Sequence, residues 1–191
     1  MNKILAFSGS SRKDSFNKKM LNVAIVGAET AGAEVTVIDL ADYPMPIYNG
    51  DLENNEGMPE HAQAFKKLLT EHDGLLIASP EYNSSFPALL KNAIDWASRS
   101  ESPDETRLSA YQNKIAAIMC ATPGGSGGMK ALLFLRLQLE YLSMIVLPNQ
   151  QSLSQAHQAF DDNGVLVDQK KVTAVKSVGA DLANALLKMN A

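Results

Sequence analysis

Short apolar runs alternate with amphipathic segments along the whole chain, and this alternation restricts the fold more than any other feature. Five runs have the length and composition of β-strands: residues 3–8, 34–39, 74–79, 114–121 and 144–147. Segments with apolar residues at helical spacing separate them. Strands that alternate with helices form parallel βαβ units, because a crossover helix must return the chain across one face of the sheet.

The segments between these runs, and the segment after the last run, have helical periodicity. Met20, Ala24 and Ala28 lie on one face of the first segment, and Gly32 is typical of a helix end. Further helices are expected from Met58 or Pro59 to Glu71, from Leu89 to Ala97, over 126–142 and over 168–189. A long loop at 41–57 and a charged loop at 99–112 complete the chain.

The third and fourth runs are apolar almost throughout, which indicates burial on both faces of a sheet. We therefore predict an α/β fold, in which a doubly wound, five-stranded parallel sheet carries helices on both faces. The expected strand order is 2-1-3-4-5, and residues 1–191 are expected to form a single domain. Ligands bind such sheets at the carboxyl ends of the strands, so the loops after strands one, three and four should line the site.

Composition excludes several classes of protein. Hydrophobic residues make up 46% of the chain, which is too many for a disordered protein. The net charge of −4 disfavours a nucleic-acid partner, which requires a basic surface. The single cysteine, Cys120, together with the lack of a membrane span or secretion signal, predicts a cytoplasmic protein. The three histidines lack metal-ligand spacing, so no metal site is predicted: His61, His72 and His157.

The first loop of the expected site joins strand one to the N-terminus of the first helix. Backbone amides at a helix N-terminus favour a phosphate, and Ser10, Ser15 and Asn17 add neutral donors. Arg12 can form two hydrogen bonds to phosphate oxygens. The loop fits neither GxGxxG nor a Walker A motif, which disfavours nucleoside-triphosphate hydrolysis. The alternative interpretation is an N-cap serine in an ordinary polar loop.

The second loop follows the third strand and is stiffened at both ends by Pro80 and Pro87. Backbone groups of Glu81, Tyr82 and Asn83 are suited to the pyrimidine edge of a flavin. Alternatively, Tyr82 is a packing residue and Asn83 a turn residue. The third loop, residues 121–128, contains four glycines, which allow close approach of the backbone to a ligand but are also typical of a flexible connector.

Three sequence features together resemble a known family. They are GSSRKDSFN at 9–17, SPEYNSSFPALLKNAIDW at 79–96, and the glycine-rich loop after strand four. This combination resembles the NAD(P)H-dependent FMN reductases with a flavodoxin-like fold, which include bacterial quinone, chromate and azo-dye reductases. The resemblance covers essentially the whole chain. Asp14 stands where the family frequently has glycine, which places a carboxylate near the expected phosphate unless Asp14 caps the helix.

The resemblance implies FMN as cofactor and NADPH or NADH as co-substrate. It assigns the FMN phosphate to the first loop, at Ser10, Arg12, Ser15, Phe16 and Asn17. It assigns one border of the isoalloxazine ring to the second loop, at Pro80, Glu81, Tyr82 and Asn83. It assigns the other side of the ring to the third loop, at Thr122, Pro123 and Gly124. A homodimer or homotetramer is also implied, and residues 43–49 fit either a segment that reaches a partner subunit or a local lid.

The predicted reaction is a ping-pong hydride transfer. A hydride passes from the nicotinamide to N5 of the flavin, and a small-molecule acceptor then takes the electrons in the same place. This scheme needs no side-chain nucleophile, so no catalytic side chain is assigned; Cys120 is expected to be buried and inert, and Trp96 to serve packing or an interface. The acceptor (quinone, azo dye, nitro compound, chromate or free flavin) and the choice between NADH and NADPH stay open.

Two alternative functions share the predicted fold. A flavodoxin-type electron carrier is disfavoured, because carriers have a threonine-rich phosphate loop and this loop contains Arg12. A phospho-acceptor receiver domain needs acidic residues after strands one and three. Those strand ends are Phe7-Ser8-Gly9 and Ala78-Ser79-Pro80 here, so the receiver is also disfavoured.

Overall fold

The computed structural model describes residues 2–189 and is built around one parallel sheet. The strands follow the order β2-β1-β3-β4-β5, as predicted, and a further strand, β6, also pairs with β4. Their bounds are β1 Lys3–Ser8, β2 Glu34–Asp39, β3 Gly74–Ala78, β4 Ile115–Ala121, β5 Ile145–Val146 and β6 Gln151–Leu153. Every pairing between these strands is parallel, so they all run in the same direction across the sheet.

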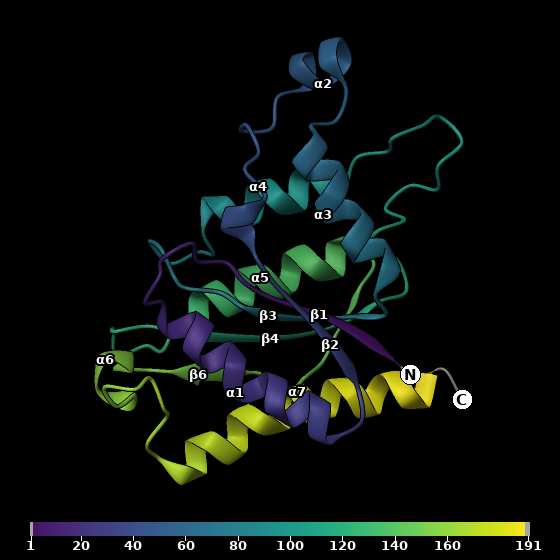
Figure 1. Ribbon diagram of the computed structural model, residues 1–191. Coiled ribbons are helices and arrows are strands. Elements are labelled where there is room, and N and C mark those ends of the chain that lie inside the picture. Colours follow the sequence, from purple (N-terminus) through teal and green to yellow (C-terminus); the bar gives the residue numbers. More distant parts are fainter. Residues whose placement is uncertain (1, 190–191) are drawn as a thin grey trace.

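Helices cover both faces of this sheet (Figure 1). One face carries α1 (Phe16–Thr30) and α7 (Gln169–Met189), and the other carries α3 (Glu60–Glu71), α4 (Ala88–Ala97) and α5 (Met129–Tyr141). Alternation along β1 explains the two layers. Ile4 and Ala6 are buried in the core beneath α1 and α7, whereas Leu5 and Phe7 are buried in the core beneath α3, α4 and α5.

The fifth position of the sheet differs from the prediction of one strand at 144–147. Its first part is β5, which pairs only with Ile115 and Ala116 of β4. Pro148 follows and has no N–H to donate to a ladder, which ends the pairing there. The chain then returns to β4 as β6, opposite Met119, Cys120 and Ala121. The sheet therefore has six strands instead of five.

Residues 41–57, predicted as a loop, form an arm that begins within the short helix η1 (Leu40–Asp42) and contains the short helix α2 (Gly50–Glu56). The arm projects from the helical layer that contains α4 (Figure 1). Asn92 Nδ2 and Trp96 Nε1 of α4 both donate to the carbonyl of Pro46, at 2.9 and 2.7 Å. The Tyr48 ring lies against Trp96 with centroids 5.0 Å apart. Trp96, 0% exposed, is thus a packing residue, and it anchors the arm.

Helices α1 and α7 cross at two glycines. A Cβ atom added at Gly27 would lie 2.0 Å from the carbonyl oxygen of Lys176, and one added at Gly179 would lie 2.0 Å from that of Ala24. The two backbones are therefore in direct contact. None of the helices within residues 2–189 is both long and apolar enough to cross a membrane.

Candidate functional site

The loops after β1, β3 and β4 meet at the carboxyl edge of the sheet, where the strand order reverses beside β1. They enclose a cavity. Its lining residues are Ser10, Arg12, Ser15, Phe16, Asn17, Pro80, Glu81, Tyr82, Ala121, Thr122 and Pro123. Of the predicted site residues, only Asn83 and Gly124 are outside this lining, and Ala121 is an addition to the prediction.

Serine hydroxyls shape the first loop. Ser10 Oγ accepts from the N–H of Arg12 at 3.3 Å, and Ser15 Oγ accepts from the N–H of Asn17 at 3.2 Å. Each hydroxyl acts there as an acceptor and keeps its own proton to donate to a ligand. Ser15 is the N-cap of α1, so the predicted capping role is correct for Ser15, while Asp14 does not cap the helix.

The first loop has the donors that a phosphate dianion requires. The backbone N–H groups of Phe16 and Lys18 find no acceptor within residues 2–189, as expected at a helix N-terminus. The guanidinium of Arg12 is exposed and forms no ion pair in the described part of the chain. No acidic residue lies in the first turn of α1. The helix dipole, the amides, the two hydroxyls and Arg12 therefore all favour an anion here.

The side chain of Asn17 forms hydrogen bonds within the protein. Its Nδ2 donates to the carbonyl of Ala121 at 2.8 Å, and its Oδ1 accepts from the N–H of Ala121, also at 2.8 Å. The side chain is 2% exposed and fastens the first loop to the end of β4. The phosphate contact predicted for Asn17 stays a prediction, since Nδ2 carries a second hydrogen besides the one bonded to Ala121.

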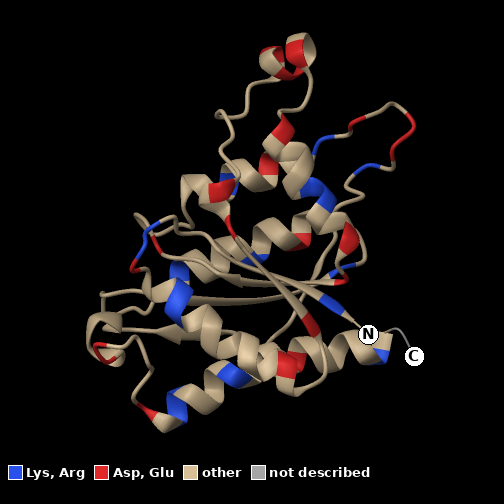
Figure 2. Ribbon diagram, in the orientation of Figure 1, with Lys and Arg blue, Asp and Glu red and all other residues tan. Residues whose placement is uncertain are grey.

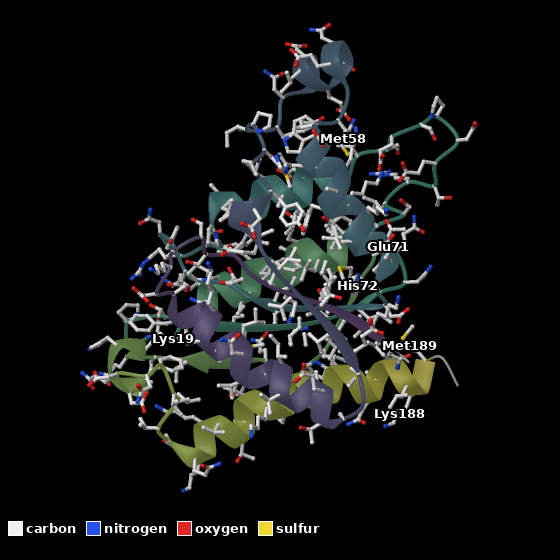
Figure 3. The ribbon with its side chains drawn as sticks, viewed as in Figure 1. Lys19, Met58, Glu71, His72, Lys188 and Met189 are labelled. Carbon is white, nitrogen blue, oxygen red and sulfur yellow. The ribbon has the colours of Figure 1, made fainter. Side chains whose placement is uncertain are left out.

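The ring of Phe16 points toward the segment that contains α6 (Ala156–Ala159). It stacks on Phe160 with centroids 6.1 Å apart and planes 9° apart, and Lys19 Nζ lies 5.9 Å from both centroids. Figure 3 labels Lys19 at the end of α1 that lies beside α6. The ring of Phe16 thus packs against the residue that follows α6, while its backbone N–H has no acceptor within residues 2–189.

The second loop forms a tight turn. Tyr82 and Ser85 exchange two backbone hydrogen bonds, at 2.8 and 3.1 Å, across Asn83 and Ser84, whose φ angles are 50° and 69°. Positive φ at both central positions defines a type I′ turn, in which asparagine is favoured. Asn83 is therefore a turn residue. Tyr82 is 52% exposed and lines the cavity, so it does not belong to the buried core.

Two backbone donors of this loop are free to bind a ligand. The N–H groups of Glu81 and Asn83 have no acceptor within residues 2–189. The carboxylate of Glu81 points elsewhere, because Oε2 accepts from the N–H of Ala131 in α5 at 3.1 Å. The sequence contains no signal for this contact, since the two residues lie 50 positions apart.

The third loop is anchored, in contrast to a flexible connector. The N–H of Ala156 donates to the carbonyl of Thr122 at 3.0 Å, and the N–H of Gln155 donates to that of Gly124 at 3.3 Å. Thr122 Oγ1 accepts from the N–H of Gly124 at 3.0 Å, and Gly124 itself does not line the cavity. Cys120 is fully buried behind this loop, and burial, with a smaller contribution from the Glu81 charge, raises the pKa of its thiol to about 12.

A wider hollow lies outside this site, between α3 and the segment 99–112. Its central cation, Lys66, is 3% exposed and already bonded to the carbonyl of Arg99 and to the carboxylate of Glu105, each at 2.7 Å. Glu101 also pairs with Lys66, at 3.2 Å. These contacts hold the charged segment against α3 and give Lys66 a structural role.

Comparison with known proteins identifies the family. Residues 2–158 match the model of the NADPH-dependent FMN reductase family. The chain belongs to this family. The resemblance inferred from the three sequence features is therefore confirmed, and with it the assignment of the chain to FMN-dependent, NAD(P)H-oxidising enzymes.

Relatives of this enzyme family extend along nearly the whole chain. An NAD(P)H:quinone oxidoreductase of Solanum tuberosum is 35% identical over 192 residues, covering 98% of this chain and 94% of the relative. An NAD(P)H-dependent FMN reductase of Pseudomonas aeruginosa is 38% identical over 169 residues, covering 88% and 86%. Among solved structures, the flavoenzyme NAD(P)H:(acceptor) oxidoreductase FerB of Paracoccus denitrificans superposes with a TM-score of 0.81 at 28% identity, covering 98% of both chains.

Proposed function

We propose that this protein is an FMN-dependent oxidoreductase that accepts a hydride from NADPH or NADH and delivers electrons to a small-molecule acceptor of the quinone class. The observation that carries this proposal is the three-loop cavity. At one end of it lie Arg12 and the N-terminus of α1, whose first turn contains no acidic residue. The backbone N–H groups of Glu81 and Asn83, which have no acceptor within residues 2–189, belong to the loop that forms one wall. The quinone-reducing and FMN-reducing relatives support the same reaction.

Each wall would hold a different part of FMN. Arg12, the hydroxyls of Ser10 and Ser15, and the amides at the start of α1 would bind the phosphate. The amides of the second loop would hydrogen-bond the pyrimidine edge of the ring, and Thr122 and Pro123 would border its other side. Bound FMN supplies the redox chemistry, and the chain supplies binding, orientation and a preset electrostatic environment. No side chain is assigned a catalytic proton transfer.

A flavodoxin-type electron carrier is the alternative, and steady-state kinetics separate the two functions. The FMN-loaded protein is assayed with NADPH at several fixed concentrations of benzoquinone. A ping-pong enzyme gives parallel double-reciprocal lines, because the first product leaves before the quinone binds. Intersecting lines contradict the ping-pong scheme, and turnover no faster than that of free FMN identifies a carrier.

We further propose that the protein acts in the cytoplasm without a nucleic-acid partner. The net charge is −4, and Figure 2 shows acidic and basic residues interspersed along the ribbon. Binding to nucleic acid gains most of its affinity when cationic side chains displace counterions from phosphates, and a net negative charge disfavours that binding.

We propose self-association into a homodimer or homotetramer through α5. The outer face of this helix is exposed and apolar along its whole length, through Met129, Leu133, Phe134, Leu137 and Tyr141. An apolar face of this kind marks an interface more often than a free surface. The arm at 43–49, which is bonded to α4 and projects outward, supports the partner-reaching interpretation over a lid. Sedimentation velocity tests the proposal, and a monomer at micromolar concentration contradicts it.

A further inference from the structure

Helix α5 begins without a cap of its own. Its N-cap residue is Gly128, which has no side chain to accept a hydrogen bond, and the first turn contains no acidic residue. The N–H of Met129 makes only a long bond of 3.4 Å to Ser126, and that of Lys130 has no acceptor within residues 2–189. A helix start of this kind lacks the stabilisation that serine, threonine or aspartate normally gives.

The buried thiol behind the third loop explains why a local cap is missing. Gly128 has a φ of 83°, which disfavours any other residue, and a Cβ atom added there would lie 1.9 Å from Cys120 Sγ. A capping side chain at this position would therefore clash with the core. The acceptor for the first turn of α5 must come from another part of the chain.

Glu81 provides that acceptor from the second loop. Its Oε2 lies 3.1 Å from the backbone nitrogen of Ala131, the third residue of α5. A carboxylate is also favoured there by the positive end of the helix dipole. A second contact, from Lys130 Nζ to Ser84 Oγ at 3.3 Å, joins the same two segments.

We propose that Glu81 is a positioning residue that caps α5 across the site and thereby sets the second loop against the third before the cofactor binds. This inference rests on the proposed FMN site, since Glu81 and Thr122 line the same cavity. A wall that is already in place avoids the entropic cost of ordering it during binding. The role depends on an acceptor oxygen at residue 81 more than on its charge.

Amide hydrogen exchange and FMN titration test the proposal on four proteins: the wild type, Glu81→Ala, Glu81→Gln and Glu60→Ala. Glutamine keeps an acceptor oxygen of the same reach. Glu60 is the matched control, because it is an exposed glutamate in the first turn of α3 and makes no contact with the cavity. Exchange is measured on each apoprotein, and thermal melts verify that each variant is folded.

In Glu81→Ala we expect exchange at Ala131 and its neighbours, and the Kd for FMN, each to rise about tenfold, in line with the loss of a charge-assisted cap. Glu81→Gln should restore both to within about threefold of wild type, since a neutral hydrogen bond is weaker by about that factor. Glu60→Ala should change neither. Unchanged exchange at Ala131 in Glu81→Ala overturns the capping role.

Increased exchange with unchanged FMN affinity overturns the positioning role. A glutamine variant as impaired as the alanine variant also contradicts the proposal, because only the charge would then matter. Failure of the wild type itself to bind FMN contradicts the proposed function instead. The exchange data are collected without FMN, so the two failures are distinguishable.

Discussion

Replacing Arg12 with alanine tests the phosphate end of the site. Arg12 is exposed and forms no ion pair within residues 2–189, so the folded state does not depend on its side chain. Loss of a hydrogen bond to a charged group costs about 1.5–3 kcal/mol. At about 1.4 kcal/mol for each factor of ten, the Kd for FMN should rise about 10- to 150-fold.

Titration of the apoprotein by flavin fluorescence, with FMN and with riboflavin, gives the required measurement. Riboflavin lacks the phosphate, so Arg12→Ala should leave its affinity unchanged while that of FMN falls. Lys13→Ala is the matched control: it removes the same charge from the next residue, whose side chain is exposed and does not line the cavity. We expect less than about a threefold effect from Lys13→Ala, because interactions between exposed charges are screened by solvent and salt.

Two results refute this reasoning. Unchanged FMN affinity in Arg12→Ala means that Arg12 does not contact the phosphate. An equal loss of affinity for FMN and riboflavin means that Arg12 acts on the ring or on the loop conformation.

Two further predictions concern the scaffold. Gly179→Ala should lower the free energy of unfolding by about 1–3 kcal/mol in urea denaturation, because its Cβ would lie 2.0 Å from the carbonyl oxygen of Ala24. Gly125→Ala is the control, since an added Cβ there has open space, and it should lower the free energy of unfolding by less than about 1 kcal/mol. Equal losses of stability in the two variants contradict the close crossing of α1 and α7. Burial raises the pKa of the Cys120 thiol from 9.0 to about 12, so the folded state retains a proton that the unfolded state releases, and stability should fall as pH rises from 9 to 12. Cys120→Ala should lack that part of the decline, and an identical pH slope in the variant contradicts the burial of the thiol.

The layers of the fold were predictable because each strand and helix carries its own periodic signal. The apolar runs at 74–79 and 114–121 correspond to β3 and β4, which are buried at every position. Strand β6 had no such signal, since Gln-Ser-Leu is short and only its last residue is apolar. It forms because β4 extends beyond the end of β5 and leaves backbone groups to pair.

The sequence predicted which loops form the candidate site, but it did not predict which contacts each side chain makes. Topology alone brings the ends of β1, β3 and β4 to one edge, so the lining followed from the strand order. The contacts of Asn17 with Ala121 and of Glu81 with Ala131 join residues that lie 104 and 50 positions apart. No local pattern encodes such pairs, and both are determined by tertiary packing.

The central claim is that FMN held by these three loops is reduced directly by NAD(P)H. The most direct measurement is an anaerobic titration of the FMN-loaded protein with NADPH and, separately, with NADH, while the visible flavin spectrum is recorded. We predict that one equivalent of at least one nucleotide bleaches the flavin fully and that addition of benzoquinone restores the oxidised spectrum. A protein that binds no FMN, or a bound flavin that neither nucleotide reduces faster than free FMN, contradicts the claim.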